Sequence, residues 1–186
     1  DLHRVDRRQR QMCIRDSTTV AQFGQHEHVE VRQGSGLKVL SPGEADCIAI
    51  AGMGASTIIS ILEDDTEVAQ SAELLVLQPM AGAASLRAWL CSHGWQLAAE
   101  ELVDDAPHFY EIIAAKRGLA PVYSAAECAV GPLLLAQKHP LLGKQLERQL
   151  ATCRQLLENM GRSERARASE KYKEIEALKA ELEVLQ

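Results

Sequence analysis

A continuous apolar run at residues 47–54, Cys-Ile-Ala-Ile-Ala-Gly-Met-Gly, ends in almost bare backbone. The five residues between Asp46 and Gly52 are typical of a strand that is covered on both faces in a parallel sheet. Glycines allow φ > 0 and let another group approach the backbone closely. The run therefore predicts a buried parallel strand, followed either by a tight turn or by a bend against which a ligand lies.

Gly, Pro and polar clusters divide the neighbouring sequence into alternating strands and helices. We expect strands at 29–32, 47–51 and 74–77, a turn at 33–36, helices at 56–62 and 83–93, and a hairpin of 95–103 with 109–116. Ser56 or Thr57 is available near the N-cap of the first helix. This order predicts the last part of a doubly wound α/β sheet, as in S-adenosylmethionine-dependent methyltransferases, where ligands lie beyond the carboxyl ends of the strands.

Beyond Pro121 the pattern is helical only. Apolar residues recur at steps of three and four in two segments, first Leu146, Leu150, Cys153, Leu157 and Met160, then Ile175, Leu178, Leu182 and Leu185. This spacing predicts two coiled-coil helices. The polar loop 161–167 between them is short, which favours an antiparallel pair.

Composition excludes several classes of function. Hydrophobic residues make up 46% of the chain, but no apolar run reaches the roughly 18 residues of a membrane helix. The five cysteines are widely spaced without a C-x-x-C pair, which favours reduced thiols in a cytoplasmic protein without a metal site. The net charge of −6 argues against general polyanion binding. Neither a P-loop nor a G-x-G-x-x-G fingerprint is present, which argues against phosphoryl and hydride transfer.

Residues 1–17 differ from the rest in composition. They contain five arginines and three aspartates, with neither a signal-peptide core nor an amphipathic helix face. We interpret them as a non-native, adapter-like segment. The alternative is a basic arm that holds RNA.

The string VEVRQGSGLKVLSPGEADCIAIAGMGASTIISIL, followed by LLVLQP, LRAWL and FYEIIAAK, resembles the bacterial tRNA (adenine(22)-N1)-methyltransferase family. The resemblance extends from about Thr18 to the C-terminus, and IAGMG and LQP are its most specific segments. It implies transfer of a methyl group from S-adenosylmethionine to N1 of an adenine in tRNA. The implied fold is α/β: a Rossmann-like class I methyltransferase sheet over 18–120, with C-terminal antiparallel coiled-coil helices over 121–186.

The resemblance also assigns roles to residues. Gly34, Ser35 and Gly36 match the family's G-D-G-L turn, in which the acidic residue accepts a hydrogen bond from the donor's adenine amino group. Ser35 replaces that acid here. The remaining matches are cofactor-binding Gly52, Met53 and Gly54, and substrate-binding Met53, Gln78 and Pro79, with Met80 where the family usually has Asn. Arg162, Arg165 and Arg167 are candidates for tRNA phosphate contacts, or form a solvated loop paired with Glu164 and Glu170.

One family segment is absent from the sequence. Family members begin with a strand and a Gly-rich loop of the Asp-Ile-Gly-Ser-Asp-His type, which holds the methionine part of the donor. We therefore expect a partial sheet whose first strands are missing, and a fragment of the enzyme that is inactive alone. Catalytic residues and oligomeric state are not indicated.

Two other functions stay open. The chain can be a non-catalytic interaction or RNA-binding protein that acts through its coiled coil. It can also be a methyltransferase that acts on another base or on a protein. The glycine clusters alone are equally compatible with tight turns.

The fragment interpretation predicts a difference in donor binding. Isothermal titration of S-adenosylmethionine should give no binding to residues 18–186 and clear binding once the family's first two strands precede them. Equal binding by both forms would contradict the interpretation, and binding by neither would favour the interaction protein.

Overall fold

The computed structural model describes residues 14–25 and 27–186. The chain divides into two compact units, and each is described by itself. The first holds the described part of Asp1–Asp46 together with Ser60–Ala72, and the second holds Cys47–Ile59 and Glu73–Gln186. The predicted boundaries at 17/18 and 120/121 stay predictions.

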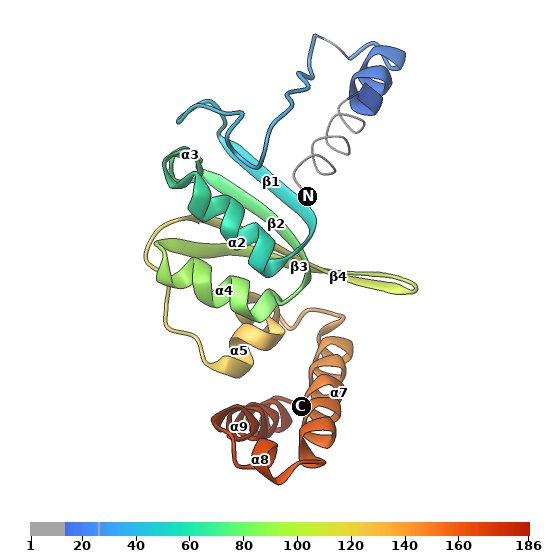
Figure 1. Ribbon diagram of the computed structural model, residues 1–186, viewed down its shortest axis with the longest axis vertical. Coiled ribbons are helices and arrows are strands. Elements are labelled where there is room, and N and C mark those ends of the chain that lie inside the picture. Colours follow the sequence, from blue (N-terminus) through green and yellow to red (C-terminus); the bar gives the residue numbers. More distant parts are fainter. Residues whose placement is uncertain (1–13, 26) are drawn as a thin grey trace. The chain divides into compact units, whose positions relative to one another are not determined.

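The second unit contains a four-stranded mixed sheet (Figure 1). Its strands are β1 (Cys47–Gly54), β2 (Leu74–Ala81), β3 (Trp95–Asp105) and β4 (His108–Arg117), in the order β1-β2-β4-β3. β1 and β2 are parallel, whereas β4 runs antiparallel to both β2 and β3. The predicted parallel pair and the predicted hairpin are therefore confirmed.

Helices follow the strands in the expected order. They are α2 (Ala55–Asp64), α3 (Thr66–Ser71), α4 (Ala83–Ser92), α5 (Ala125–Val130), α6 (Pro132–Ala136), α7 (Leu142–Gly161), α8 (Glu164–Arg167) and α9 (Glu170–Val184). Residues 14–22 are also helical. α4 buries Leu86 and Leu90, four residues apart on one face, and it ends before Gly94, whose φ of +79° breaks the helical conformation.

The strand predicted at residues 29–32 is wrong. In the described part of the chain this segment has no strand assignment and lies outside the four-stranded sheet. A strand requires a neighbour that receives its backbone hydrogen bonds. Here Arg32 binds within its own loop instead, because its guanidinium donates to Glu30 at 2.8 Å and to the carbonyl oxygen of Val39 at 3.0 Å.

One expectation about β1 is corrected, and one about α2 is confirmed. Ile48 and Ile50 are buried, but the alternate residues of β1 are exposed, so the strand is covered on one face only. The prediction assumed a central strand, whereas β1 lies at the edge of the described sheet. Ser56 and Thr57 lie in the first turn of α2, near its N-cap as predicted, because β1 runs directly into α2 at Ala55.

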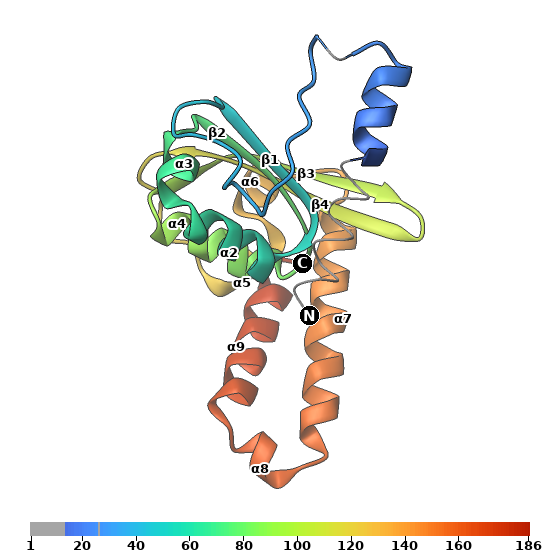
Figure 2. The ribbon, with the colours of Figure 1, turned by 45° about the horizontal axis from the view of Figure 1, so that its top comes forward.

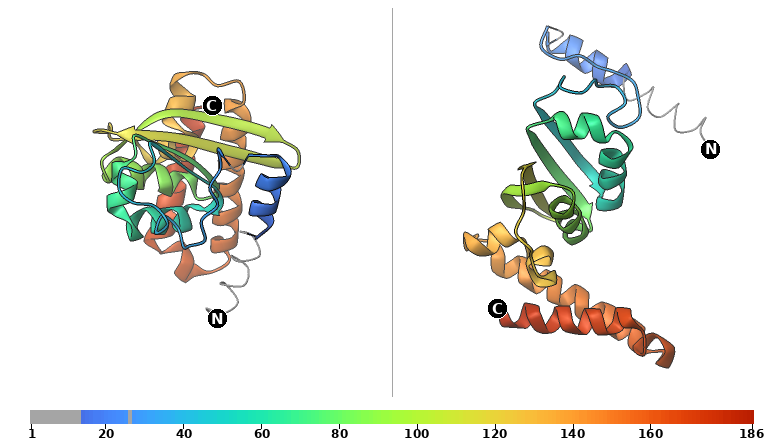
Figure 3. Two further views of the ribbon diagram at one scale, coloured as in Figure 1. Left: turned by 90° about the horizontal axis from the view of Figure 1, so that it is seen from above. Right: turned by 90° about the vertical axis from the view of Figure 1, so that its left-hand side faces the viewer.

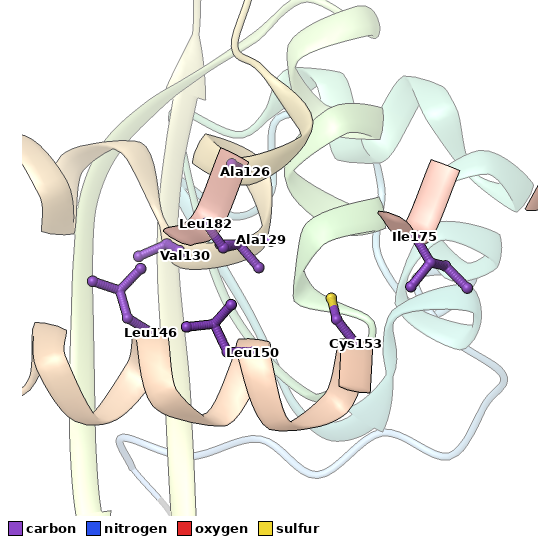
Figure 4. Close-up of a cluster of buried hydrophobic side chains, with 8 residues drawn as sticks. All are labelled: Ala126, Ala129, Val130, Leu146, Leu150, Cys153, Ile175 and Leu182. Atoms are coloured by element: carbon purple, nitrogen blue, oxygen red, sulfur yellow. The ribbon is translucent and has the colours of Figure 1, made fainter. Parts of the chain in front are cut away.

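The C-terminal helices form the predicted antiparallel pair. α7 and α9 lie side by side, with α8 in the connection between them (Figures 2 and 3). Their apolar faces meet α5 in one buried cluster (Figure 4), made of Ala126, Ala129, Val130, Leu146, Leu150, Cys153, Ile175 and Leu182. The helix pair is confirmed, and its coiled-coil character stays a prediction.

A buried ionic network joins the sheet to the helices. Arg87 of α4 is fully buried, and its Nε donates to Glu100 Oε1 of β3 at 2.5 Å. Its Nη2 donates to Glu111 Oε2 of β4 at 2.9 Å, and its Nη1 to the carbonyl oxygen of Cys128 in α5 at 2.9 Å. Glu100 Oε2 accepts from the N–H of Leu133 in α6 at 2.8 Å. One guanidinium thus connects two strands and α5 to α4, and Glu100 extends the network to α6.

Replacement of Arg87 should therefore destabilise the protein strongly. Arg87→Met leaves two carboxylates without their partner, which costs about 3–5 kcal/mol of unfolding free energy. Urea denaturation followed by circular dichroism measures the loss. Arg154→Met, on the exposed face of α7, is the matched control and should change stability by less than about 0.5 kcal/mol. Equal midpoints for the two variants would contradict the assigned role.

Candidate functional site

The carboxyl ends of β1 and β2 lie next to each other in the second unit. The backbone of β1 bends at Gly52, whose φ is +76°, and the pairing with β2 shifts register on both sides of Met53. Gln78 of β2 reaches across to this bend, where its Oε1 accepts from the N–H of Gly52 at 2.9 Å. The structure thus brings together two of the predicted motifs, Gly-Met-Gly and Gln-Pro.

The two glycines of this bend have different requirements. Gly52 needs its left-handed conformation, which side chains rarely adopt. Gly54 has no positive φ, and nothing lies within 4 Å of a Cβ built on it. Neither the backbone conformation nor contacts within the protein therefore require a glycine at position 54. The open space above it lies directly before α2, where a ligand can approach the backbone.

Two methionines lie at the bend, Met53 within it and Met80 on the neighbouring strand β2. Met53 is 41% exposed and Met80 is 54% exposed, which is high for large apolar side chains. Gln78 Nε2 donates to the sulfur of Met80 at 3.5 Å. Unbranched thioethers adapt their shape to flat or irregular ligands. The strand ends therefore present a flexible apolar surface around an open backbone.

The first glycine cluster lies in the other unit. Residues 34–36 lead into a turn at 36–39, in which Lys38 N–H donates to Ser35 O at 3.2 Å, so the turn begins later in the chain than the predicted one at 33–36. A Cβ on Gly34 would lie 2.1 Å from Val39 Cγ1, and Gly36 has a φ of +57°. Local packing and conformation thus account for both glycines. Ser35 is exposed, and the donor-binding role of these residues stays a prediction.

Of the three predicted RNA-binding arginines, Arg162 precedes α8, and Arg165 and Arg167 lie in it, at the end of the helix pair remote from the sheet (Figure 2). All three are exposed. Arg162 lies 3.5 Å from Glu158, and Arg167 Nε donates to the carbonyl oxygen of Gly161 at 2.5 Å. The alternative pairing with Glu170 is not observed in the described residues, where Glu170 pairs with Lys173.

Three cysteines that are at least partly buried have thiols of low reactivity. Burial raises the pKa of Cys91, Cys128 and Cys153, which keeps these thiols protonated and weakly nucleophilic.

Among residues 14–25 and 27–186 no group of three or more His, Cys, Asp or Glu side chains is arranged to hold a metal ion. Within the same ranges no helix combines the length and apolar character needed to cross a bilayer.

A parallel strand pair with an open glycine bend at its carboxyl end defines an α/β protein of the ligand-binding, Rossmann-like kind. The family model described as tRNA (adenine(22)-N(1))-methyltransferase matches residues 15–185. A curated relative of that name from Bacillus subtilis is 31% identical over 171 residues, covering 89% of this chain and 71% of the relative. The chain therefore belongs to the tRNA (adenine(22)-N(1))-methyltransferase family.

Solved structures support the same relationship. The crystal structure of the B. subtilis m1A22 tRNA methyltransferase has a TM-score of 0.77 and 30% identity, covering 89% of this chain and 74% of that one. A candidate tRNA (m1A22) methyltransferase from Streptococcus pneumoniae, solved with S-adenosyl-L-methionine, has a TM-score of 0.71 and 27% identity, covering 91% and 73%. The predicted Rossmann-like α/β class is thus confirmed, and the chain is related to enzymes.

The two glycines of the bend should respond differently to alanine. Gly52→Ala places a side chain in the left-handed region and should cost about 1–2 kcal/mol of unfolding free energy. Gly54→Ala should leave stability unchanged or raise it slightly, because the added methyl group meets nothing. Thermal and urea unfolding of both variants measure this. A loss at Gly54 equal to that at Gly52 would contradict the open space described here.

Proposed function

We propose that this protein acts in S-adenosylmethionine-dependent methylation of N1 of an adenine in tRNA, in the cytoplasm. The observation that carries the proposal is the open bend at Gly52–Gly54. It lies at the carboxyl ends of parallel strands, where ligands of such sheets bind. The family relationship supplies the substrate class, tRNA.

The residues of the bend suit a flat or extended donor. Gly54 leaves a space that a Cβ would occupy, and Gly52 turns its N–H toward Gln78 rather than toward solvent. We assign Gly34, Ser35 and Gly36 to the adenosine side of the donor. Ser35 can accept a hydrogen bond from the amino group, but charge-assisted bonds are roughly twice as strong as neutral ones. Donor affinity should therefore be lower than with an acid at this position.

Methyl transfer to adenine N1 requires little from the protein beyond alignment of the two reactants. When bound, the donor supplies a sulfonium-activated methyl group. Adenine N1 carries a lone pair and no proton, so no base is needed to expose the nucleophile. Orientation of two reactants can lower a barrier by roughly 7–11 kcal/mol in favourable cases. The residues at the strand ends therefore act by holding the base and excluding water.

Met53 is our candidate for contact with the adenine, with Gln78 and Pro79 at its edge. An adenine within a folded RNA must leave its stack before N1 can react, and extruded bases are held by stacking and by hydrogen bonds to their edges. The exposed thioether of Met53 can supply the apolar contact. Gln78 is committed through Oε1 to Gly52 and through one Nε2 hydrogen to the sulfur of Met80, so one N–H remains to donate to a base.

Arg162, Arg165 and Arg167 are our candidates for phosphate contacts. Each contact to a phosphate releases counterions, which makes binding depend on salt. The remoteness of α8 from the sheet agrees with a substrate as large as tRNA (Figure 2). The finer partner assignments, namely the absence of a metal and of a membrane, belong to this proposal as well.

A steric block at Gly54 tests the proposal. The chain, preceded by the family's donor-loop segment, should transfer labelled methyl groups to a tRNA that carries adenine at position 22 and not to the same tRNA with guanine there. Gly54→Val should lower the initial rate at least about tenfold, which corresponds to about 1.4 kcal/mol. Calorimetry shows whether the loss comes from donor binding.

Gly143→Val in α7 is the matched control, because a Cβ at position 143 also meets nothing within 4 Å. It should leave the rate unchanged. Transfer that is insensitive to Gly54→Val would remove the bend from the site. Absence of any transfer to the adenine-containing tRNA would remove the function.

A further inference from the structure

The β3–β4 hairpin extends past the strands that carry the proposed site. The register of β2 with β4 runs from Leu74 opposite Lys116 to Leu77 opposite Ile113, and no further pairing with β2 follows. β3 and β4 stay paired to Asp105 opposite His108. The outer part of the hairpin therefore projects on the side toward which β1 and β2 point, as Figures 1 and 2 show. This is the side of the glycine bend.

Alternation along the strands divides the projecting part into two faces. Val103 lies opposite Tyr110, and Asp105 lies opposite His108, which places these four residues on one face. The other face carries Phe109 and Glu111.

The second face is tied to the helices. The ring of Phe109 lies under Arg148 Cζ at 4.4 Å and under Lys144 Nζ at 5.5 Å. Lys144 also forms an ion pair with Asp104, and Glu111 accepts from Arg87 at 2.9 Å. The hairpin is therefore held from this side, and its opposite face has a defined orientation.

The first face presents apolar and aromatic groups to solvent. Val103 is 39% exposed, His108 is exposed and Tyr110 is half-buried. The rings of His108 and Tyr110 are neighbours, with centroids 5.8 Å apart and planes inclined by 41°. Val103 and His108 therefore do not belong to the core, and Tyr110 keeps part of its surface in solvent.

We propose that Val103, His108 and Tyr110, here named the hairpin face, bind unpaired nucleotides of the tRNA beside the adenine that is methylated. The inference rests on the proposed function, because it takes tRNA as the substrate. Single-stranded RNA is bound by stacking of its bases on aromatic side chains. The hairpin projects at the carboxyl edge of the sheet, which is also the edge at which the proposed site lies.

A stacked base suits this surface better than a folded protein does. A stable protein interface takes about 800 Å² from each partner, with a buried apolar centre. Three side chains on a narrow hairpin offer much less. One or two bases need only a ring and an adjoining apolar group.

The test compares substitutions on the two faces in the 186-residue chain, with tRNA binding measured by filter retention. Tyr110→Ala should raise the Kd for tRNA about tenfold, within the range expected for loss of one stacked base. Tyr110→Phe should restore binding, because the ring is kept. Phe109→Leu, on the opposite face, is the control for a merely structural effect and should bind as the unchanged chain does.

Unchanged binding by Tyr110→Ala would overturn the inference and leave the proposed function in place. Equal weakening by Tyr110→Ala and Phe109→Leu would also overturn it, since the hairpin would then act only through its shape. A chain that binds no tRNA at all would overturn both the inference and the proposed function.

Discussion

The buried guanidinium of Arg87 is the constraint on which the arrangement of the second unit depends. An ion removed from water costs several kcal/mol unless its hydrogen bonds are satisfied. Here three of its nitrogens donate, two of them to carboxylates on adjacent strands. Glu100 is satisfied in turn by the N–H of Leu133 at the start of α6. The network fixes where α5 and α6 meet the sheet, and the tight turn at Gly131, with φ +114°, lies against the same guanidinium.

This constraint links the projecting hairpin to the helix pair, the two surfaces on which we propose contacts with tRNA. α5 forms part of the apolar cluster on which α7 and α9 pack, so the helix pair is built on an element that Arg87 holds (Figure 4). Glu111 belongs both to the network and to the projecting hairpin. A second connection comes from His139, whose Nε2 lies 2.5 Å from Glu101 Oε1 and lowers the pKa of that carboxyl group. A tRNA that contacts the hairpin and the helix pair would therefore meet surfaces with a defined spacing.

Periodicity predicted the elements better than it predicted their surroundings. The run of Ile48 and Ile50 indicated β1, and the steps from Leu146 to Cys153 indicated the buried side of α7, because burial of one face imposes a repeat. The segment at 29–32 has the composition of a strand, but a strand also needs a partner, which composition does not reveal. Arg87 and Glu100 carry charges that sequence patterns place in solvent, so their burial depends on a pairing 13 residues apart. The proposed site was indicated by its glycines, whereas the bond from Gly52 to Gln78 required the register of two strands.

The glycines themselves separate structural from functional requirements. Gly34 is explained by the side chain of Val39, Gly36 and Gly52 by their positive φ, and Gly82 by its φ of +78° with Ala55 only 3.1 Å from a Cβ. None of these four needs a ligand to account for it. Gly54 differs, since its conformation suits any residue and the space above it is open. A glycine lowers stability in such a position because it loses more conformational freedom on folding than alanine does. Gly143 and Gly161 in α7 are equally open, so space alone does not identify a site; the position of Gly54 at the carboxyl ends of two parallel strands is the reason that we propose the reacting groups beside it.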